Sequence, residues 1–89
     1  MPASNVTIIN RLGLHARAAA KFVQTAAGFA SSVTVTRDTR SVNGKSIMGV
    51  MTLAAAQGAE LTIETAGEDA EAALAALVGL VEEKFGESA

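Results

Sequence analysis

The sequence predicts a two-layer α/β sandwich with the element order β-α-β-β-α-β-α. Short runs of β-branched residues alternate with polar ones, which is typical of antiparallel strands that have one buried and one solvated face. Between them lie alanine-rich segments whose apolar residues recur at helical spacing. No linker or repeat interrupts the pattern. A chain of 89 residues can close one core, so we expect residues 1–89 to form a single domain with its helices on one face of the sheet.

Four segments are expected to form the strands, and they cover residues 5–10, 32–37, 40–43 and 60–65. In the first, Val6 and Ile8 share one face, and in the last Leu61 and Ile63 point inward. The short third strand is placed at an edge of the sheet. Four threonines suit a partly solvated strand surface: Thr34, Thr36, Thr62 and Thr65.

The remaining elements are three amphipathic helices. The first begins at Ala16 and is stopped by Gly28. Ser46 is a suitable N-cap for a short middle helix over residues 47–54. The last helix starts after acidic residues that favour a helix N-terminus, and Gly86 ends it. Its expected core face is Ala70, Leu74, Leu77, Val78, Val81 and Phe85.

Composition excludes several classes of function. The net charge is −2, so the chain has no overall positive charge to attract nucleic acid. It has only 3 aromatic residues, too few to stack against the bases of a single strand. Without cysteine, and with a single histidine, no disulfide, thiolate or multi-histidine metal site is expected. We expect no metal and no cofactor. The N-terminus is unlike a signal peptide and no apolar run reaches membrane-spanning length, so we expect a cytoplasmic protein that does not bind membranes.

The charges are unevenly distributed along the chain. Six of the seven cations lie between residues 11 and 45, and eight of the nine acids lie between residues 60 and 87. One interpretation is that both groups are simply solvated. The other is a mildly positive face around His15 that attracts an anionic group or an acidic partner.

His15 is the first candidate functional residue. It follows a turn containing Gly13 and opens the first helix, with Arg17 two residues later. Unpaired N–H groups at a helix start favour the neutral, nucleophilic imidazole and also an anion bonded to it. With the Arg17 guanidinium, these features indicate a phosphoryl acceptor site. The alternative is that His15 only caps the helix or is solvated.

A second candidate region begins at Ser46. Apolar side chains of the middle helix cover roughly 220° of its circumference, although packing on a sheet needs only about 100°. If Val50, Leu53 and Ala54 face the sheet, the exposed residues are Ile47, Met48 and Met51. They form either a docking patch for partners or part of a helix that is simply well buried. Ser46 is either only an N-cap or also a phosphoacceptor at the border of this patch.

The segments Gly13–Arg17 and Asn43–Met51 resemble the two signatures of HPr, the histidine-containing phosphocarrier of the phosphotransferase system. The resemblance extends over essentially the whole chain. It implies an open-faced sandwich with strand order 1-4-2-3. It also implies a phosphoryl carrier, and not an enzyme, in which His15 accepts a phosphoryl group on Nδ1 from phospho-enzyme I and passes it to a histidine of a IIA protein.

Further roles follow from the same resemblance. Arg17 would steady the phosphoryl group, and Ser46 would be phosphorylated by an HPr kinase/phosphorylase. The partner-binding surface would comprise Ile47, Met48 and Met51 together with Ala16, Ala20 and Lys21 of the first helix. We expect a monomer. Ala18 replaces a proline common in the family, which leaves one more N–H near the phosphoryl group.

Two alternatives from other classes remain open at this stage. One is a regulatory binding module controlled by phosphorylation of Ser46 without histidine chemistry. The other is a small phosphatase-like enzyme that binds phosphate through Arg11 or Arg17. The resemblance also leaves open whether the carrier serves carbohydrate transport or a nitrogen-related chain.

Overall fold

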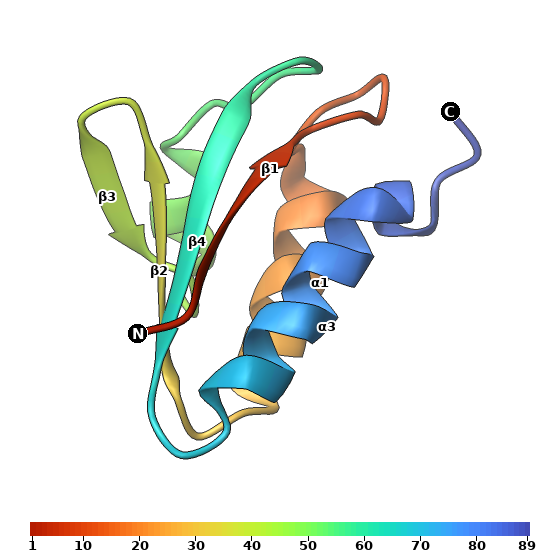
Figure 1. The fold of residues 1–89 in the computed structure, drawn as a ribbon. Coiled ribbons are helices and arrows are strands. Elements are labelled where there is room, and N and C mark those ends of the chain that lie inside the picture. Colours follow the sequence, from red (N-terminus) through yellow and green to blue (C-terminus); the bar gives the residue numbers. More distant parts are fainter.

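The computed structural model describes residues 1–89 and confirms the predicted order of strands and helices (Figure 1). A short 3₁₀ helix, η1, follows the last α-helix. The elements are β1 (Ala3–Thr7), α1 (Ala16–Ala27), β2 (Ser32–Arg37), β3 (Arg40–Asn43), α2 (Ile47–Met51), β4 (Glu60–Ala66), α3 (Ala70–Glu82) and η1 (Lys84–Gly86).

The four strands form one antiparallel sheet in the order β1-β4-β2-β3, as predicted. β4 lies between β1 and β2, with Leu61 opposite Val6 and Ile63 opposite Val35. β3 is an edge strand, which also agrees with the prediction. The helices pack on one face of the sheet, and Figure 1 shows α1 and α3 side by side in that layer.

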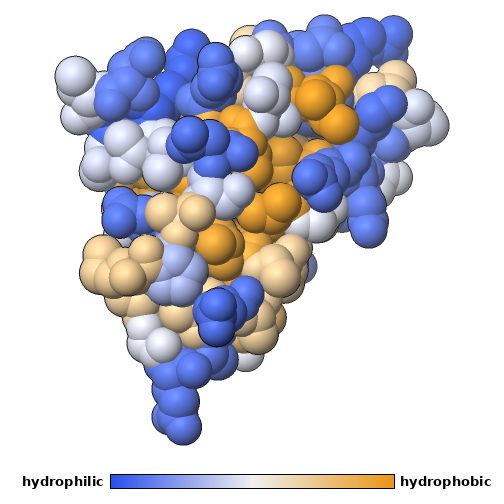
Figure 2. Space-filling view, viewed as in Figure 1, coloured by the Kyte–Doolittle hydropathy of each residue, from blue (hydrophilic) through white to orange (hydrophobic).

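The core lies between the sheet and the helices. Leu61 and Ile63 are buried, as their alternation with polar residues predicted, and Phe22 and Leu77 meet them from α1 and α3. Figure 2 shows an apolar band where the sheet and the helical layer meet, bordered by hydrophilic residues. None of the helices is long and apolar enough to span a membrane.

The prediction for the first strand is wrong at its boundaries. β1 runs from Ala3 to Thr7, because its pairing with β4 ends where Thr7 lies opposite Glu60. Ile8 is nevertheless fully buried, and its N–H donates to the carbonyl of Ala59 at 2.9 Å.

The prediction that Thr65 lies on a solvated surface is also wrong. Its side chain is buried, and its hydroxyl donates to the Ala70 carbonyl at 2.7 Å. Thr65 faces inward on β4 together with Leu61 and Ile63. The hydroxyl can be buried there without a large free-energy cost because it has a hydrogen-bond acceptor.

Both later helices end earlier than predicted. α2 stops at Met51, and Ala54 has φ +50°, a left-handed conformation that no α-helix continues. Ala54 is exposed and does not face the sheet. α3 stops at Glu82, and Lys84 and Phe85 have φ of 58° and 56°. Phe85 therefore enters the core from the turn after α3 and not from the helix face.

Candidate functional site

His15 is the N-cap residue of α1, at the helix start where the sequence placed it, with extended backbone angles (φ −76°, ψ 178°). Its carbonyl accepts the Ala19 N–H at 2.8 Å, which begins the helical ladder. Its ring makes no capping hydrogen bond. The backbone N–H groups of Ala16, Arg17 and Ala18 likewise have no hydrogen-bond partner in the protein. The first turn of α1 therefore offers three donors and the positive end of a helix dipole beside the imidazole.

The loop before His15 is held by a close approach to the segment after α2. The Leu14 N–H donates to the Ala55 carbonyl at 2.8 Å, and the Leu14 side chain is buried. Gly13 has φ +69°, and a Cβ there would lie 2.7 Å from the Ala55 oxygen. Only glycine avoids both the strained conformation and that clash, so this turn places His15 at a defined position.

The His15 ring contacts a residue near the C-terminus that the sequence did not indicate. Its Nε2 lies 2.5 Å from Oε2 of Glu87, and the other oxygen of that carboxylate accepts from Nδ2 of Asn10 at 3.0 Å. The hydrogen bond with His15, followed by the one from Asn10, lowers the pKa of Glu87 below its usual value. The carboxylate is thus held in its ionised form beside the ring.

The predicted residues of α1 differ in their availability. Arg17 is exposed and its side chain has no hydrogen-bond or ion-pair partner in the protein. Ala16 is exposed and Ala20 is half-buried. Lys21 is half-buried, and its ammonium group donates to the Phe85 carbonyl at 2.7 Å. Arg17 is therefore the cation of this turn that is free to meet an anion, whereas Lys21 holds the C-terminal segment.

Ser46 is the N-cap of α2, as predicted, and its Oγ accepts the Gly49 N–H at 3.1 Å. After this cap the helix divides into a buried and an exposed face. Val50 is buried, but Ile47, Met48 and Met51 are 42%, 74% and 41% exposed. Of the two alternatives that the sequence left open, a well-buried helix and one with these three residues exposed, the structure has the second, although Ala54 does not face the sheet. Because α2 packs against α1, the apolar surface and the helix that starts at His15 are neighbours.

Leu12 adds an apolar side chain that the sequence reasoning did not single out. It is 66% exposed in the loop before His15. The signal that could have found it is its position in a turn, where a large apolar residue has no core to enter.

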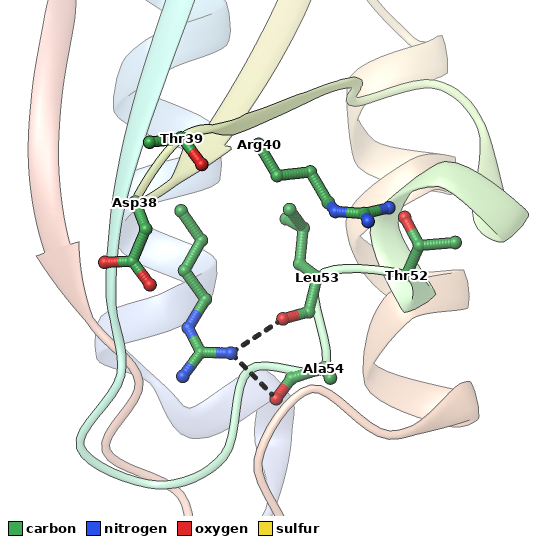
Figure 3. A pocket seen from close by; sticks show the side chains of 7 residues that line it. Asp38, Thr39, Arg40, Thr52, Leu53 and Ala54 are labelled. Carbon is green, nitrogen blue, oxygen red and sulfur yellow. Dashed lines mark hydrogen bonds between the residues drawn. The ribbon is translucent and has the colours of Figure 1, made fainter.

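A separate pocket of about 320 Å³ lies at the β2–β3 turn (Figure 3). Arg37 lines this pocket, and its guanidinium is already used inside the protein. Its Nη1 donates to the carbonyls of Leu53 and Ala54 at 2.9 and 3.3 Å. Arg37 thereby secures the segment whose next residue, Ala55, holds Leu14. No cluster of three or more histidine, cysteine or acidic side chains could hold a metal ion.

The chain is similar to a family of known proteins over most of its length. The family model described as "PTS HPr component phosphorylation site" matches residues 3–83. The phosphocarrier protein HPr of Pseudomonas aeruginosa is 54% identical over 88 residues, which cover 98% of each chain. HPr of Cupriavidus necator is 53% identical over 83 residues, covering 93% of each chain.

Solved structures show the same relationship in the fold. A crystal structure of HPr from Thermoanaerobacter tengcongensis has a TM-score of 0.97 and 48% identity, with all of both chains covered. Crh, the catabolite repression protein of Bacillus subtilis, has a TM-score of 0.76 and 44% identity, covering 94% of this chain and 97% of its own. That Crh structure is a domain-swapped dimer.

Proposed function

Since the chain belongs to the HPr family of phosphocarrier proteins of the phosphotransferase system, we propose that His15 is its phosphoryl acceptor. The group would come from phospho-enzyme I and leave to a histidine of a IIA protein. The observation that carries this proposal is the position of His15 at the start of α1, whose first turn has three unpaired backbone N–H groups and the free Arg17 side chain.

The chemistry needs a nucleophile and a means of holding a dianion. Nε2 of His15 is engaged by Glu87, so Nδ1 is the ring nitrogen left to attack phosphorus. The lone pair of Nδ1 forms the new P–N bond while the P–N bond of the donor breaks and its electron pair returns to the donor nitrogen. The N–H groups of Ala16, Arg17 and Ala18, and the Arg17 guanidinium, then bind the phosphoryl oxygens. No metal or cofactor is required of the carrier, because the donor is already activated.

The same proposal assigns partner docking to the exposed face of α2. Ile47, Met48 and Met51 would bury their apolar surface against enzyme I and against the IIA protein in turn, since flexible methionines adapt to different partners. Ala16 and Ala20 of α1 would extend the contact towards His15. Lys21 would contribute through its aliphatic stem, because its ammonium group is used inside the protein.

Ser46 is the proposed regulatory residue. A phosphate there would add about −2 charge at the border of the docking face. It could remain on the start of α2 and repel an acidic partner, so that an HPr kinase/phosphorylase would control docking with little refolding. We place this relay in the cytoplasm and propose that the carrier acts as a monomer, which sedimentation at micromolar concentration would test.

The experiment that tests the proposal is labelling with phosphoenolpyruvate and enzyme I. The wild-type protein should take up one phosphoryl group that is labile in acid and stable in base, as a phosphohistidine is. His15→Ala should take up none, and Ser46→Ala, the matched control, should label normally. Equal labelling of His15→Ala and wild type would disprove the proposal.

The same variants separate the regulatory alternative. A pure binding module would keep normal partner regulation in His15→Ala and lose it in Ser46→Ala.

A further inference from the structure

We propose that Asn10 and Glu87 together select the tautomer of the His15 ring, and so determine which ring nitrogen is nucleophilic. The inference rests on the proposed function, because it concerns the nitrogen that receives the phosphoryl group. Neither residue belongs to the two segments that resemble the HPr signatures. Glu87 reaches the His15 ring only in the folded chain, where Asn10 also contacts it.

The orientation of the Asn10 amide is set by its surroundings. Asn10 is fully buried, and its Nδ2 donates to the Gly13 carbonyl at 2.8 Å and to Oε1 of Glu87 at 3.0 Å. The two hydrogens of the amide are thus both used. A flipped amide would turn its oxygen towards a carbonyl and a carboxylate, which repel it. Oδ1 is buried without a partner, so the protein accepts an unsatisfied oxygen to keep these two donors in place.

The carboxylate of Glu87 transmits this orientation to the ring. Oε1 is taken by Asn10, and Oε2 lies 2.5 Å from Nε2 of His15. An ionised carboxylate can only accept hydrogen bonds, and the lowered pKa of Glu87 keeps it ionised. Nε2 must therefore carry a hydrogen. In the neutral ring the other nitrogen, Nδ1, then holds the free electron pair.

Glu87 is held in place although it is the third residue from the C-terminus. Phe85 is buried in the core, and its carbonyl accepts from Nζ of Lys21. On the other side of Glu87, the carbonyl of Ala89 accepts the Arg11 N–H at 2.9 Å. Anchors on both sides reduce the entropy that the carboxylate loses when it binds the ring.

The same carboxylate acts on the phosphorylated form. When Nδ1 gains the phosphoryl group and Nε2 keeps its hydrogen, the ring becomes positively charged with no proton gained or lost overall. Glu87 then faces a cation across a short hydrogen bond. Glu87 and Asn10 are therefore positioning residues for the acceptor nitrogen and do not touch the phosphoryl group themselves.

The test compares Glu87→Gln with Glu87→Ala by ¹⁵N NMR of the His15 ring at a pH where the ring is neutral. In Glu87→Gln, the Asn10 donor should select the amide oxygen of the new side chain. The amide NH₂ would then face Nε2, which can accept only in the Nδ1–H tautomer. We expect the Gln variant to show Nδ1–H, the wild type to show Nε2–H, and Glu87→Ala to show a mixture.

Glu83→Gln is the matched control, because it removes the same charge from an exposed side chain without a hydrogen-bond partner, and it should behave as wild type. A merely structural role of Glu87 would affect the Ala variant at least as much as the Gln variant. A wild-type tautomer in Glu87→Gln would overturn the inference, and so would Nδ1–H in the wild type.

Transfer from phospho-enzyme I provides the second readout. Glu87→Gln should be slower than wild type by at least about tenfold, since a histidine held in the wrong tautomer loses its nucleophilic nitrogen. Glu87→Ala should be affected less. A wild-type protein that takes up no phosphoryl group would disprove the proposed function. The ¹⁵N NMR measurement of the His15 tautomer in the Glu87 variants would still test the inference about Asn10 and Glu87 separately.

Discussion

At the scale of single residues, Ser46 caps α2 and is also the proposed phosphoacceptor. Its hydroxyl accepts the Gly49 N–H, which satisfies one of the free donors at the start of α2. Ser46 is half-buried and precedes the exposed apolar side chains of α2. A residue that both caps a helix and accepts a phosphate can change the surface charge without changing the fold.

Variants of Ser46 separate the cap from the regulation. Ser46→Ala should lower the free energy of unfolding by about 1 kcal/mol, because the cap is lost. Ser46→Asp keeps a capping oxygen and should remain close to wild type in stability while accepting the phosphoryl group from enzyme I more slowly. Urea denaturation and labelling kinetics measure the two effects. Ser88→Ala, an exposed serine without a side-chain hydrogen bond, is the stability control. Unchanged transfer in Ser46→Asp would contradict the electrostatic account.

At the scale of elements, several side chains tie the loops to the ends of helices and strands. Asp69 precedes α3, but its carboxylate does not cap that helix. It accepts the N–H groups of Ala30 and Ser31 at 2.9 Å each and also the Ser31 hydroxyl, which fixes the start of β2 to the start of α3. These hydrogen bonds, with that of the Ser31 side chain the largest, lower the pKa of Asp69 from 3.8 to about 2.

The lowered pKa predicts a pH dependence of stability. Because the folded-state pKa lies below the unfolded one, Asp69 stabilises the fold above about pH 4, and this contribution is lost as the pH falls towards 2. Asp69→Asn should therefore be less stable than wild type at neutral pH, and the difference should shrink between pH 4 and pH 2. Thermal unfolding across this range measures it. A difference that stays constant with pH would show that the charge of Asp69 is not the cause.

Arg37 provides a second tie between elements. Its guanidinium joins the end of β2 to the carbonyls of Leu53 and Ala54. Arg37→Ala should cost about 1 kcal/mol of unfolding free energy, a value reduced for partial exposure. Arg40→Ala is the matched control. Its side chain is exposed in the same pocket without a partner, so its effect should stay within about 0.5 kcal/mol. Equal losses in the two variants would mean that these hydrogen bonds contribute nothing.

At the scale of the whole molecule, the C-terminal segment completes the site that begins at the N-terminal loop. Figure 1 shows both segments at the same end of the fold. Phe85 is 1% exposed and inserts into the core after α3 ends. Glu87 and Ala89 then reach His15 and Arg11. Core packing and the geometry of His15 are therefore coupled through residues 84–89.

Removal of the Phe85 side chain tests this coupling. Phe85→Ala should lower the free energy of unfolding by about 3–5 kcal/mol, because it leaves a cavity in the core. The folded fraction should also show a changed His15 ring environment by NMR, since Glu87 loses its anchor. Phe29→Ala is the control, because that ring is only half-buried and lies far along the chain from Glu87. An unchanged His15 signal in folded Phe85→Ala would show that the hydrogen bonds of Lys21, Asn10 and Arg11 hold this segment without the Phe85 ring.

The sequence by itself determined the class and order of the elements, the N-cap Ser46 and the position of His15 at the start of the first helix, and it indicated the exposure of Ile47, Met48 and Met51 as one of two alternatives. These features depend on periodicity and capping over a few residues, and such local preferences act before any tertiary contact forms. Helix ends were less well predicted. Ala54, Lys84 and Phe85 adopt left-handed backbone conformations that their residue types do not favour, so their types did not indicate the helix ends.

Only the tertiary structure decided which side chains surround the His15 ring. Glu87 lies 72 residues away in the chain, and nothing in its local sequence distinguishes it from the other acids near the C-terminus. Asn10 looked like the end of a strand, yet it is buried with its donors aimed at Gly13 and Glu87. The contacts of Glu87 with His15 and Asn10 join residues more than 70 positions apart, so they depend on how the sheet and helices pack, which no local pattern records. The sequence thus identified the proposed phosphoryl acceptor, and the fold brought the carboxylate of Glu87 into contact with its ring.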